Sequence, residues 1–319
     1  MNLINYMNGS EQFLLLVSEE SVSQRLDIFV AQQIPELSRS MVKQLVEQKA
    51  IAINGITAKK SGVGLKLQDQ IVISIPASKT TNVKKWPDDI KIEIVAQQPD
   101  FMIINKPAGL MVHEPHPKCP ELTLVDWILY TSESYKNVGL PNRPAIVHRL
   151  DKDTSGIMII PKTNSAHARI GDMFKDRKMH KTYLAIVQGH PERSGTIDSH
   201  IMRHPVKKHK MAAACTLREK SQGRQATTHY QVKEYFQDGS LIEVHPVTGR
   251  THQIRVHLSS IGHPIVGDTV YGNKSELIAR QALHAHKIAF EYDTQKHEFF
   301  VEVPGDFQKL LNELKKLQL

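Results

Sequence analysis

Cysteine is scarce in this chain, with only Cys119 and Cys215 among 319 residues. Two thiols cannot build a disulfide framework, and neither stands in a spacing typical of a zinc site. Histidine is more frequent, with 17 residues, but pairs such as His284 and His286 also lack standard metal-ligand spacing. The sequence therefore predicts a protein without a disulfide framework and without a bound metal.

Long hydrophobic runs are also missing. Near the N-terminus the longest aliphatic stretch covers residues 13–17, which is far too short for a signal sequence or a membrane span. We therefore expect a cytoplasmic protein with no membrane partner. The chain also lacks a P-loop, a dinucleotide-binding fingerprint and a Gly-x-Ser-x-Gly elbow. These absences argue against nucleoside triphosphates, nicotinamide cofactors and common hydrolases, and they predict a reaction that uses no cofactor.

Negative charge is depleted in one part of the chain. Residues 141–225 hold 17 lysines and arginines against 7 aspartates and glutamates, a net charge of +10 in a protein of net charge +8. A basic block of this size suits a polyanion, because cations that contact phosphates release counterions and steer association. A solvated surface that only aids solubility is the alternative, but concentration in one segment favours nucleic acid.

Residues 1–76 are predicted to form a small first domain. Apolar residues recur at helical spacing in 24–33 and in 38–48, where Ser38 is a plausible N-cap. An alternating stretch then ends in an Asn54-Gly55 turn, a strong hairpin signal, and a second alternating stretch follows. Two short helices and a few strands indicate a compact accessory unit.

A polar, aperiodic linker is predicted at residues 77–88, followed by a larger domain at residues 89–319. Helices are predicted at 123–131, opened by Thr123, and at 163–178. Strands or strand-like runs are predicted at 91–97, 101–107, 156–162, 181–189, 226–236, 240–247 and 253–262. The fold class is therefore α+β, with one large mixed, mostly antiparallel sheet flanked by helices and preceded by the small α/β unit.

Polar groups gather where three of the predicted strands begin or end. The segments are "HRLD" with Asp151, "KTYLAIVQG" with Lys181 and Tyr183, and "VTGRTHQIRVHL" with Arg250 and Arg255. If the third segment is extended, it places cations on both faces of one strand, which makes a poor core. It is either a polar edge strand or the wall of a groove for phosphates or for one acidic partner. An arginine that faces Asp151 would keep this carboxylate ionised and fix its rotamer.

Two of these residues can also be interpreted as purely structural. Asp151 could form a surface salt bridge beside the turn at 153–156, and Tyr183 alone is typical of a half-buried core residue. As part of a set, Tyr183 could stack on a base or present its hydroxyl to a reacting carbon. Asp153 could serve as the second carboxylate of a glycoside hydrolase, but "DKDTSG" is typical of a turn, which separates the two acids.

Several stretches together resemble the RluA family of pseudouridine synthases. They are "INKPAGLMVHEP", "HRLDKDTSGIMIIPKT", "FKDRKMHKTYLAIVQGHP", "GTIDSHIMRHP" and "HPVTGRTHQIRVHLSSIGHPIVGDTVYG", and the match runs from about residue 90 to 305. Residues 21–76 resemble the S4 RNA-binding domain that precedes many such catalytic domains. The order of the two domains is similar to the branch that modifies large-subunit (23S) ribosomal RNA. The resemblance implies a monomer that uses no cofactor and no metal.

The resemblance also implies roles for single residues. Asp151 matches the catalytic aspartate, and Arg255 matches the arginine that pairs with it. Tyr183 matches the tyrosine that stacks on the target base and is proposed as the proton acceptor. Arg149 matches the arginine that fills the gap left by the flipped uridine, and Arg250 is expected to support RNA or the loop. The expected substrate-binding set is completed by His148, Lys181 and His252.

The first domain departs from the family's pattern at two positions. Lys49 stands where the family usually has glycine before the strand, and Gln68 stands where Gly-Asp is usual. Residues 1–80 carry 8 basic and 7 acidic side chains, so this domain is nearly neutral.

Other functions stay open at this point. A RluC-like or tRNA-directed enzyme would share the same catalytic residues, because target choice depends on loops and on the first domain. A non-enzymatic RNA-binding or ribosome-assembly factor would have no need of Asp151. A nucleoside or glycoside hydrolase would release free base.

Overall fold

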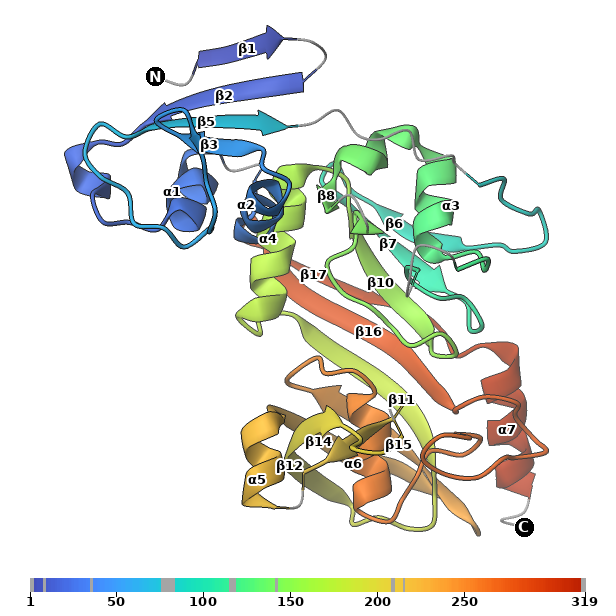
Figure 1. Cartoon of the computed structure of the whole chain (residues 1–319). Helices are drawn as coiled ribbons and strands as arrows, with labels where there is room; N and C mark the ends of the chain where they lie inside the picture. The colour runs from blue at the N-terminus through green and yellow to red at the C-terminus, as the bar shows by residue number, and fades with distance from the viewer. Residues whose placement is uncertain are drawn as a thin grey trace.

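The fold is described from a computed structural model of the chain (Figure 1). The described residues are 3–7, 10–34, 37–75, 84–114, 119–140, 143–207, 210–214 and 216–316. Cys215 and the greater part of the predicted linker lie outside these ranges. Within 84–88, Trp86 is buried in the core of the larger sheet.

The N-terminal unit is a five-stranded antiparallel sheet covered by two helices (Figure 1). Its strand order is β1 (Leu3–Met7), β2 (Ser10–Leu16), β5 (Gln70–Ile75), β3 (Ile51–Ile53) and β4 (Ile56–Thr57). The helices α1 (Leu26–Gln33) and α2 (Arg39–Glu47) form its core with the buried faces of the strands. The predicted N-cap is confirmed, since the Ser38 side chain accepts a hydrogen bond from the Met41 amide.

The hairpin of β1 and β2 was not predicted. In β2, Leu15 is buried while Leu14 and Leu16 are 37% and 61% exposed. Because both faces of the strand carry apolar residues, the period-two pattern that marks a half-buried strand is hidden.

The backbone has a positive φ at both positions where the chain departs from the family's pattern. Lys49 has φ of 61° and follows Gln48, the C-cap of α2; its amide binds the Val46 carbonyl, and the Ala50 amide binds the Leu45 carbonyl. This is a Schellman motif, whose left-handed position favours glycine. Gln68 has φ of 64° in the turn before β5. Both positions therefore hold a side chain where a glycine would be unstrained.

The larger unit is built on a ten-stranded sheet, mixed and mostly antiparallel as predicted. Its strands, in sheet order, are β13 (Met211–Ala213), β12 (Ser194–Arg203), β14 (Arg224–Tyr235), β15 (Gly239–Pro246), β11 (His180–Gln188), β16 (Leu283–Tyr292), β10 (Ser155–Pro161), β7 (Phe101–Lys106) and β6 (Glu93–Gln97), with β17 (Gln295–Phe300) beside β16. A separate two-stranded ribbon joins β8 (Gly139–Leu140) and β9 (Arg143–Pro144). Its helices are α3 (Leu124–Thr131), α4 (Asn164–Lys175), α5 (Leu217–Gln222), α6 (Gln253–Ser260) and α7 (Gly305–Lys316), with a 3-10 turn at Glu133–Asn137. A further 3-10 turn at Glu19–Ser21 belongs to the N-terminal unit.

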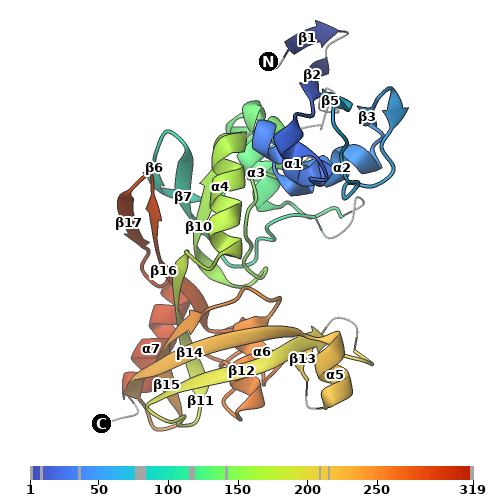
Figure 2. The same ribbon diagram turned by 90° about the vertical axis from the view of Figure 1, so that its left-hand side faces the viewer.

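Two hydrophobic cores divide this sheet into halves. One core lies around β7, β10, α3 and α4, and the other around β11, β15, α6 and α7. Figure 2 shows the halves one above the other, with β16 at their junction. The pairing of β16 with β10 is parallel and covers only Ser155 with His284 and Gly156 with Ala285. The seam between the halves is therefore narrow.

Gly156 permits this close pairing. Its φ is 121°, and a Cβ atom there would lie 2.2 Å from the Ala285 carbonyl oxygen. A side chain at this position would separate the two strands.

The strand expected at 253–262 is wrong, because α6 occupies residues 253–260. Ile254, Val256 and Leu258 are buried, and so are Gln253 and Arg255 between them. A helix that is buried on nearly all sides has no solvent-exposed face, so its sequence shows no 3.6-residue period. The alternation of polar and apolar residues along it then predicts a strand. The Gln253 side chain accepts from the Arg250 amide and thereby ties the start of the helix to the turn before it.

Candidate active site

Asp151 sits in a tight turn just before β10. The Thr154 amide donates to the Asp151 carbonyl, and the Asp151 side chain remains 18% exposed. Behind the turn lies Lys106, which is fully buried and donates from Nζ to the carbonyl oxygens of Pro107, Leu110 and Lys152. Burial lowers the pKa of Lys106 to about 7, and its side chain fixes the backbone next to the Asp151 carboxylate.

Arg255 links this carboxylate to a second, buried one. Its Nη1 atom donates to Asp151 Oδ2 at 3.0 Å, while Nε and Nη2 donate to the two oxygens of Asp268 at 2.6 and 2.9 Å. Asp268 Oδ1 also accepts from the amides of Val270 and Tyr271. The bidentate pair leaves the guanidinium one orientation, in which its free edge faces Asp151.

Burial and charge oppose each other in this pair. Burial alone would raise the pKa of Asp268, but the hydrogen bonds and charge of Arg255 outweigh it and the pKa lies below its usual value. Burial likewise opposes the charge of Arg255, yet Asp268 and Asp151 hold its pKa above the ordinary range. Both groups are therefore ionised, and the arginine presents a permanent positive charge to Asp151.

His252 approaches the same carboxylate from the other side. Its Nε2 atom lies 3.9 Å from Asp151 Oδ1, and its Nδ1 atom shares a 2.8 Å hydrogen bond with the Tyr271 hydroxyl. The Tyr271 oxygen accepts from the Met211 amide, so its own proton is free to bind Nδ1. Burial lowers the pKa of His252, which favours a neutral ring with its proton on Nε2, facing Asp151.

Tyr183 projects from β11 at a β-bulge, where the pairing with β16 shifts register between Thr182 and Tyr183. The ring packs against both hydrophobic cores. Burial, with the nearby charge of Asp151, raises the pKa of the Tyr183 phenol above its ordinary value. Lys181 lies two residues earlier on the same strand, and burial lowers its pKa to about 8.

A cavity of about 110 Å³ brings most of the predicted residues together. Seven of the eight residues predicted for catalysis or substrate binding line it: Arg149, Asp151, Lys181, Tyr183, Arg250, His252 and Arg255. Arg149 and the side chain of Arg250 lie at its open side, and Arg250 Nε also donates to the Gln225 carbonyl. Asp153, considered as a second carboxylate, does not line this cavity.

His148 is the predicted residue that lies apart from this cavity. Its Nε2 atom accepts from the Ile159 amide at 3.0 Å, and its ring stacks on Phe174 at 4.5 Å. Burial, with the charge of Lys181, lowers its pKa to about 3, so the ring is neutral. The imidazole thus supplies a hydrogen-bond acceptor to a β10 amide that lies outside the short ladder between β10 and β16.

Asp268, Lys106 and Tyr271 are site residues without a predicted role. Asp268 and Tyr271 stand in "GDTVYG" and Lys106 in "INKPAG", so all three belong to stretches that carried the resemblance. A buried charged residue produces no periodic pattern in a sequence. The loops that contain these three residues therefore predict only turns. The described residues hold no group of three or more His, Cys, Asp or Glu side chains suited to a metal ion.

The sequence comparisons agree with this geometry. A family model described as RNA pseudouridylate synthase matches residues 100–260, and an S4 domain model matches residues 24–71. The chain therefore belongs to the RNA pseudouridylate synthase family and carries an S4 domain at its N-terminus, and it is an RNA pseudouridine synthase.

Individual relatives extend over nearly the whole chain. Ribosomal large subunit pseudouridine synthase D of Zymomonas mobilis is 37% identical over 311 residues, which cover 93% of this chain and 96% of that protein. The protein of the same name from Escherichia coli K12 is 34% identical over 316 residues, covering 94% and 93%. An uncharacterized RNA pseudouridine synthase of Aquifex aeolicus is 35% identical over 311 residues, covering 93% and 96%.

Two solved human structures share the fold. Human RNA pseudouridylate synthase domain containing 1 aligns with a TM-score of 0.57 and 27% identity, covering 69% of this chain and 87% of that one. Human RNA pseudouridylate synthase domain containing 4 aligns with a TM-score of 0.54 and 25% identity, covering 70% and 92%. In the part of the chain that the structure describes, every helix is too short or too polar to span a lipid bilayer.

Proposed function

We propose that this protein converts specific uridines of large-subunit (23S) ribosomal RNA into pseudouridine, with Asp151 as the catalytic group. The observation that carries the proposal is the Asp151–Arg255–Asp268 chain, which presents one oriented carboxylate to a cavity that also contains Tyr183. The choice of RNA rests on the relatives named ribosomal large subunit pseudouridine synthase D.

The reaction is an isomerisation, so nothing is gained or lost overall. A uridine leaves its stack and enters the cavity, which costs a few kcal/mol of unstacking. Asp151 either attacks C1′ or removes a ribose proton, and the N1–C1′ bond breaks. The uracil turns and a C5–C1′ bond forms, as the Asp151–C1′ bond breaks or Asp151 returns the ribose proton. C5 then loses its proton and N1 gains one. A closed cavity is required, because a free uracil would otherwise escape.

Each side chain has a role in this scheme. Arg255 orients Asp151 and His252 faces it, while Tyr183 stacks on the uracil and accepts the C5 proton. The high pKa of Tyr183 means that the phenol is protonated in the free enzyme, so its own proton must leave as the C5 proton arrives. Arg149, Lys181 and Arg250 bind the RNA at the mouth of the cavity, and His148 supports β10 beside it.

The wider organisation is part of the same proposal. Residues 1–76 form the S4 domain, residues 77–88 a linker and residues 89–319 the catalytic domain. We propose that the enzyme acts as a monomer in the cytoplasm, on ribosomal RNA. It uses no cofactor, because the chemistry requires neither redox nor energy input.

The decisive experiment maps pseudouridine by carbodiimide labelling and primer extension on unmodified ribosomal RNA. Wild-type protein is expected to create new stops on large-subunit RNA, and Asp151→Asn is expected to create none. Stops on transfer RNA alone would identify tRNA, instead of ribosomal RNA, as the substrate. Release of free uracil would identify a hydrolase, and tight RNA binding without any pseudouridine would identify a binding factor.

A further inference from the structure

The turn that carries Asp151 is anchored through its backbone by two basic side chains. Lys106 Nζ donates to the Lys152 carbonyl at 3.1 Å, and Arg280 Nη1 donates to the Asp153 carbonyl at 3.1 Å. The two acceptors directly follow Asp151 in the chain. Arg280 does not line the cavity of Asp151, so it acts on this turn from behind, through the backbone.

The segment that begins with this arginine also binds the two residues that follow Asp153. Gln281 Nε2 donates to Thr154 Oγ1 at 3.2 Å. His284 Nδ1 shares a 2.9 Å hydrogen bond with Ser155 Oγ. Three consecutive residues of the turn are therefore tied to one segment, and a shift of this segment would be passed on to the turn.

Arg280 is itself oriented by helix α7. Its Nε and Nη2 atoms donate to the two oxygens of Asp306, in the first turn of α7, at 2.6 and 2.8 Å. Burial alone would raise the pKa of Asp306, but the hydrogen bonds and charge of Arg280 hold it below its usual value. The carboxylate is therefore ionised, and the bidentate contact leaves the guanidinium one orientation, in which Nη1 faces the Asp153 carbonyl.

Helix α7 is fixed in place by its apolar face. Phe307 and Leu310 are buried in the same core as Ile278 and Leu283, which flank Arg280 in the chain. Figure 1 shows α7 beside the start of β16. The helix therefore holds its carboxylate at a fixed position next to the segment that supports the turn.

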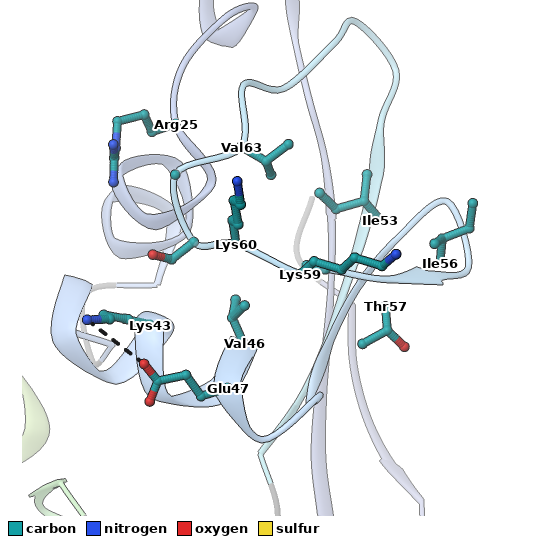
Figure 3. Close-up of a pocket in the computed structure, with 13 residues that line it drawn as sticks. Arg25, Lys43, Val46, Glu47, Ile53, Ile56, Thr57, Lys59, Lys60 and Val63 are labelled. Carbon is teal, nitrogen blue, oxygen red and sulfur yellow. Dashed lines mark ion pairs between the residues drawn. The ribbon is translucent and has the colours of Figure 1, made fainter.

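This contact differs from an ordinary surface ion pair. The Arg280 side chain is only 9% exposed, and its Nη1 atom also donates to the carbonyls of Gln281 and Leu283 at 3.1 and 3.3 Å. By contrast, Lys43 and Glu47 of α2, whose ion pair is drawn in Figure 3, are 68% and 65% exposed and lie 3.9 Å apart. An exposed pair of this kind fixes little, whereas the buried guanidinium cannot move without losing several hydrogen bonds.

We propose that Arg280 is a positioning residue for Asp151 and that Asp306 orients it, which makes helix α7 part of the support of the candidate active site. The inference rests on the proposed catalytic role of Asp151. It adds a second support beside Arg255 and Asp268: these two fix the side chain of Asp151, whereas the contact from α7 fixes its backbone. Without this contact the carboxylate would be displaced from C1′ of the target uridine, and RNA binding would be unchanged.

The test compares two variants of the contact with matched controls on α7. Asp306→Asn keeps the shape of the side chain and removes its charge, and Arg280→Gln removes the guanidinium. Leu314→Ala leaves a gap in the core beneath α7, and Glu313→Gln removes an exposed ion pair with Lys316. Tritium release from 5-tritiated uridine in large-subunit ribosomal RNA measures kcat and KM. Hydrogen exchange with mass spectrometry measures how often the turn opens.

The two variants of the contact should lose turnover without losing affinity. Asp306→Asn is expected to lower kcat about tenfold, which corresponds to one charge-assisted hydrogen bond. Arg280→Gln is expected to lower kcat about 100-fold, the effect of a displacement of about 1 Å. KM should stay within about twofold of wild type in both. Residues 151–155 should exchange faster in both, because the turn opens more often.

The controls should separate positioning from the stability of α7. Glu313→Gln should match wild type in every measurement. Leu314→Ala should unfold at a lower urea concentration, with wild-type kcat and wild-type exchange at residues 151–155. A loss of kcat in Leu314→Ala equal to that in Asp306→Asn would overturn the inference, since any loosening of α7 would then have the same effect.

Two further results would overturn the inference. They are wild-type kcat in Asp306→Asn and wild-type exchange of the turn in the same variant, and this variant decides even where Arg280→Gln fails to fold. Asp151→Asn is measured alongside: wild-type kcat there would contradict the proposed function. The exchange measurement needs no RNA, so it tests the contact between α7 and the turn whichever RNA is the substrate.

Discussion

At the scale of single residues, the Asp151 carboxylate depends on a partner that it does not touch. Asp268 is completely buried and holds Arg255 through two hydrogen bonds, and Arg255 holds Asp151 through one. Asp268 is therefore a positioning residue for Asp151.

Asp268→Asn should test this dependence. The amide keeps the shape of the side chain but removes the buried counter-charge of the guanidinium and leaves it only Asp151, and breaking a buried ion pair typically costs about 3–5 kcal/mol. We expect a lower midpoint in urea and a large loss of kcat, with KM for RNA nearly unchanged. Asp153→Asn is the control, since that side chain does not line the cavity. A variant with wild-type kcat would show that Arg255 orients Asp151 without help.

The pKa of Lys181 gives a second test at this scale. Burial lowers this pKa to about 8 in the free protein, and a bound phosphate would raise it again because it stabilises the ammonium ion. The complex therefore holds a proton that the free protein loses, and affinity for RNA should fall above about pH 8, by up to tenfold per pH unit. Binding isotherms at about pH 7 and 9 measure this change in affinity. Lys181→Arg should remove the dependence, whereas Lys175→Arg should leave it in place.

At the scale of elements, the end of α2 stores strain that a single substitution can relieve. A left-handed conformation costs a side-chain-bearing residue about 1–2 kcal/mol, and glycine gives back about 0.5–1 kcal/mol of that in unfolded-state entropy. Lys49→Gly should therefore stabilise the S4 domain by about 0.5–1 kcal/mol, measured by urea unfolding. Lys49→Ala keeps the strain and should not. Equal effects of the two would mean that the Lys49 side chain, rather than its backbone, is responsible.

The same scale shows what the sequence could predict. The strand that contains Val244 was found because polar and apolar residues alternate along it, and the strand that contains Tyr183 because a short apolar run lies between polar residues. Helix α3 was found through Thr123, which forms a capping box with Asp126. Helix α6 was missed because it is buried on all sides. Asp151 and Arg255 were predicted to pair, but Asp268 was not, because a buried ion pair depends on tertiary contacts that no local pattern records.

At the scale of the whole molecule, the candidate active site spans the seam between two cores. Asp151 precedes β10 on one side of the seam and Arg255 lies in α6 on the other, while the Tyr183 ring packs against both cores. The two residue pairs that join β10 to β16 therefore help to set the distance between Asp151 and Arg255.

Gly156→Ala should loosen this seam. The new Cβ would collide with the backbone of Ala285, at a φ of 121° that alanine rarely adopts. We expect a loss of at least about 2 kcal/mol in stability together with a fall in kcat. Gly171→Ala in α4 meets nothing within 4 Å and should gain about 0.5–1 kcal/mol instead. Calorimetry measures the stability, and tritium release from 5-tritiated uridine in RNA measures kcat. A Gly156→Ala protein as stable as wild type would contradict the close packing of β10 against β16.

The position of β16 also has a consequence for synthesis. This strand comprises residues 283–292, yet in the sheet it lies between β10 and β11, which precede it by more than a hundred residues. During translation the chain emerges from its N-terminus and folds as it emerges, so the slot between β10 and β11 stays open until almost the whole protein has been made. The S4 domain can fold early, but Asp151 meets Arg255 and Asp268 only near the end of translation. A nascent chain of this enzyme is therefore unable to modify RNA on the ribosome that is making it.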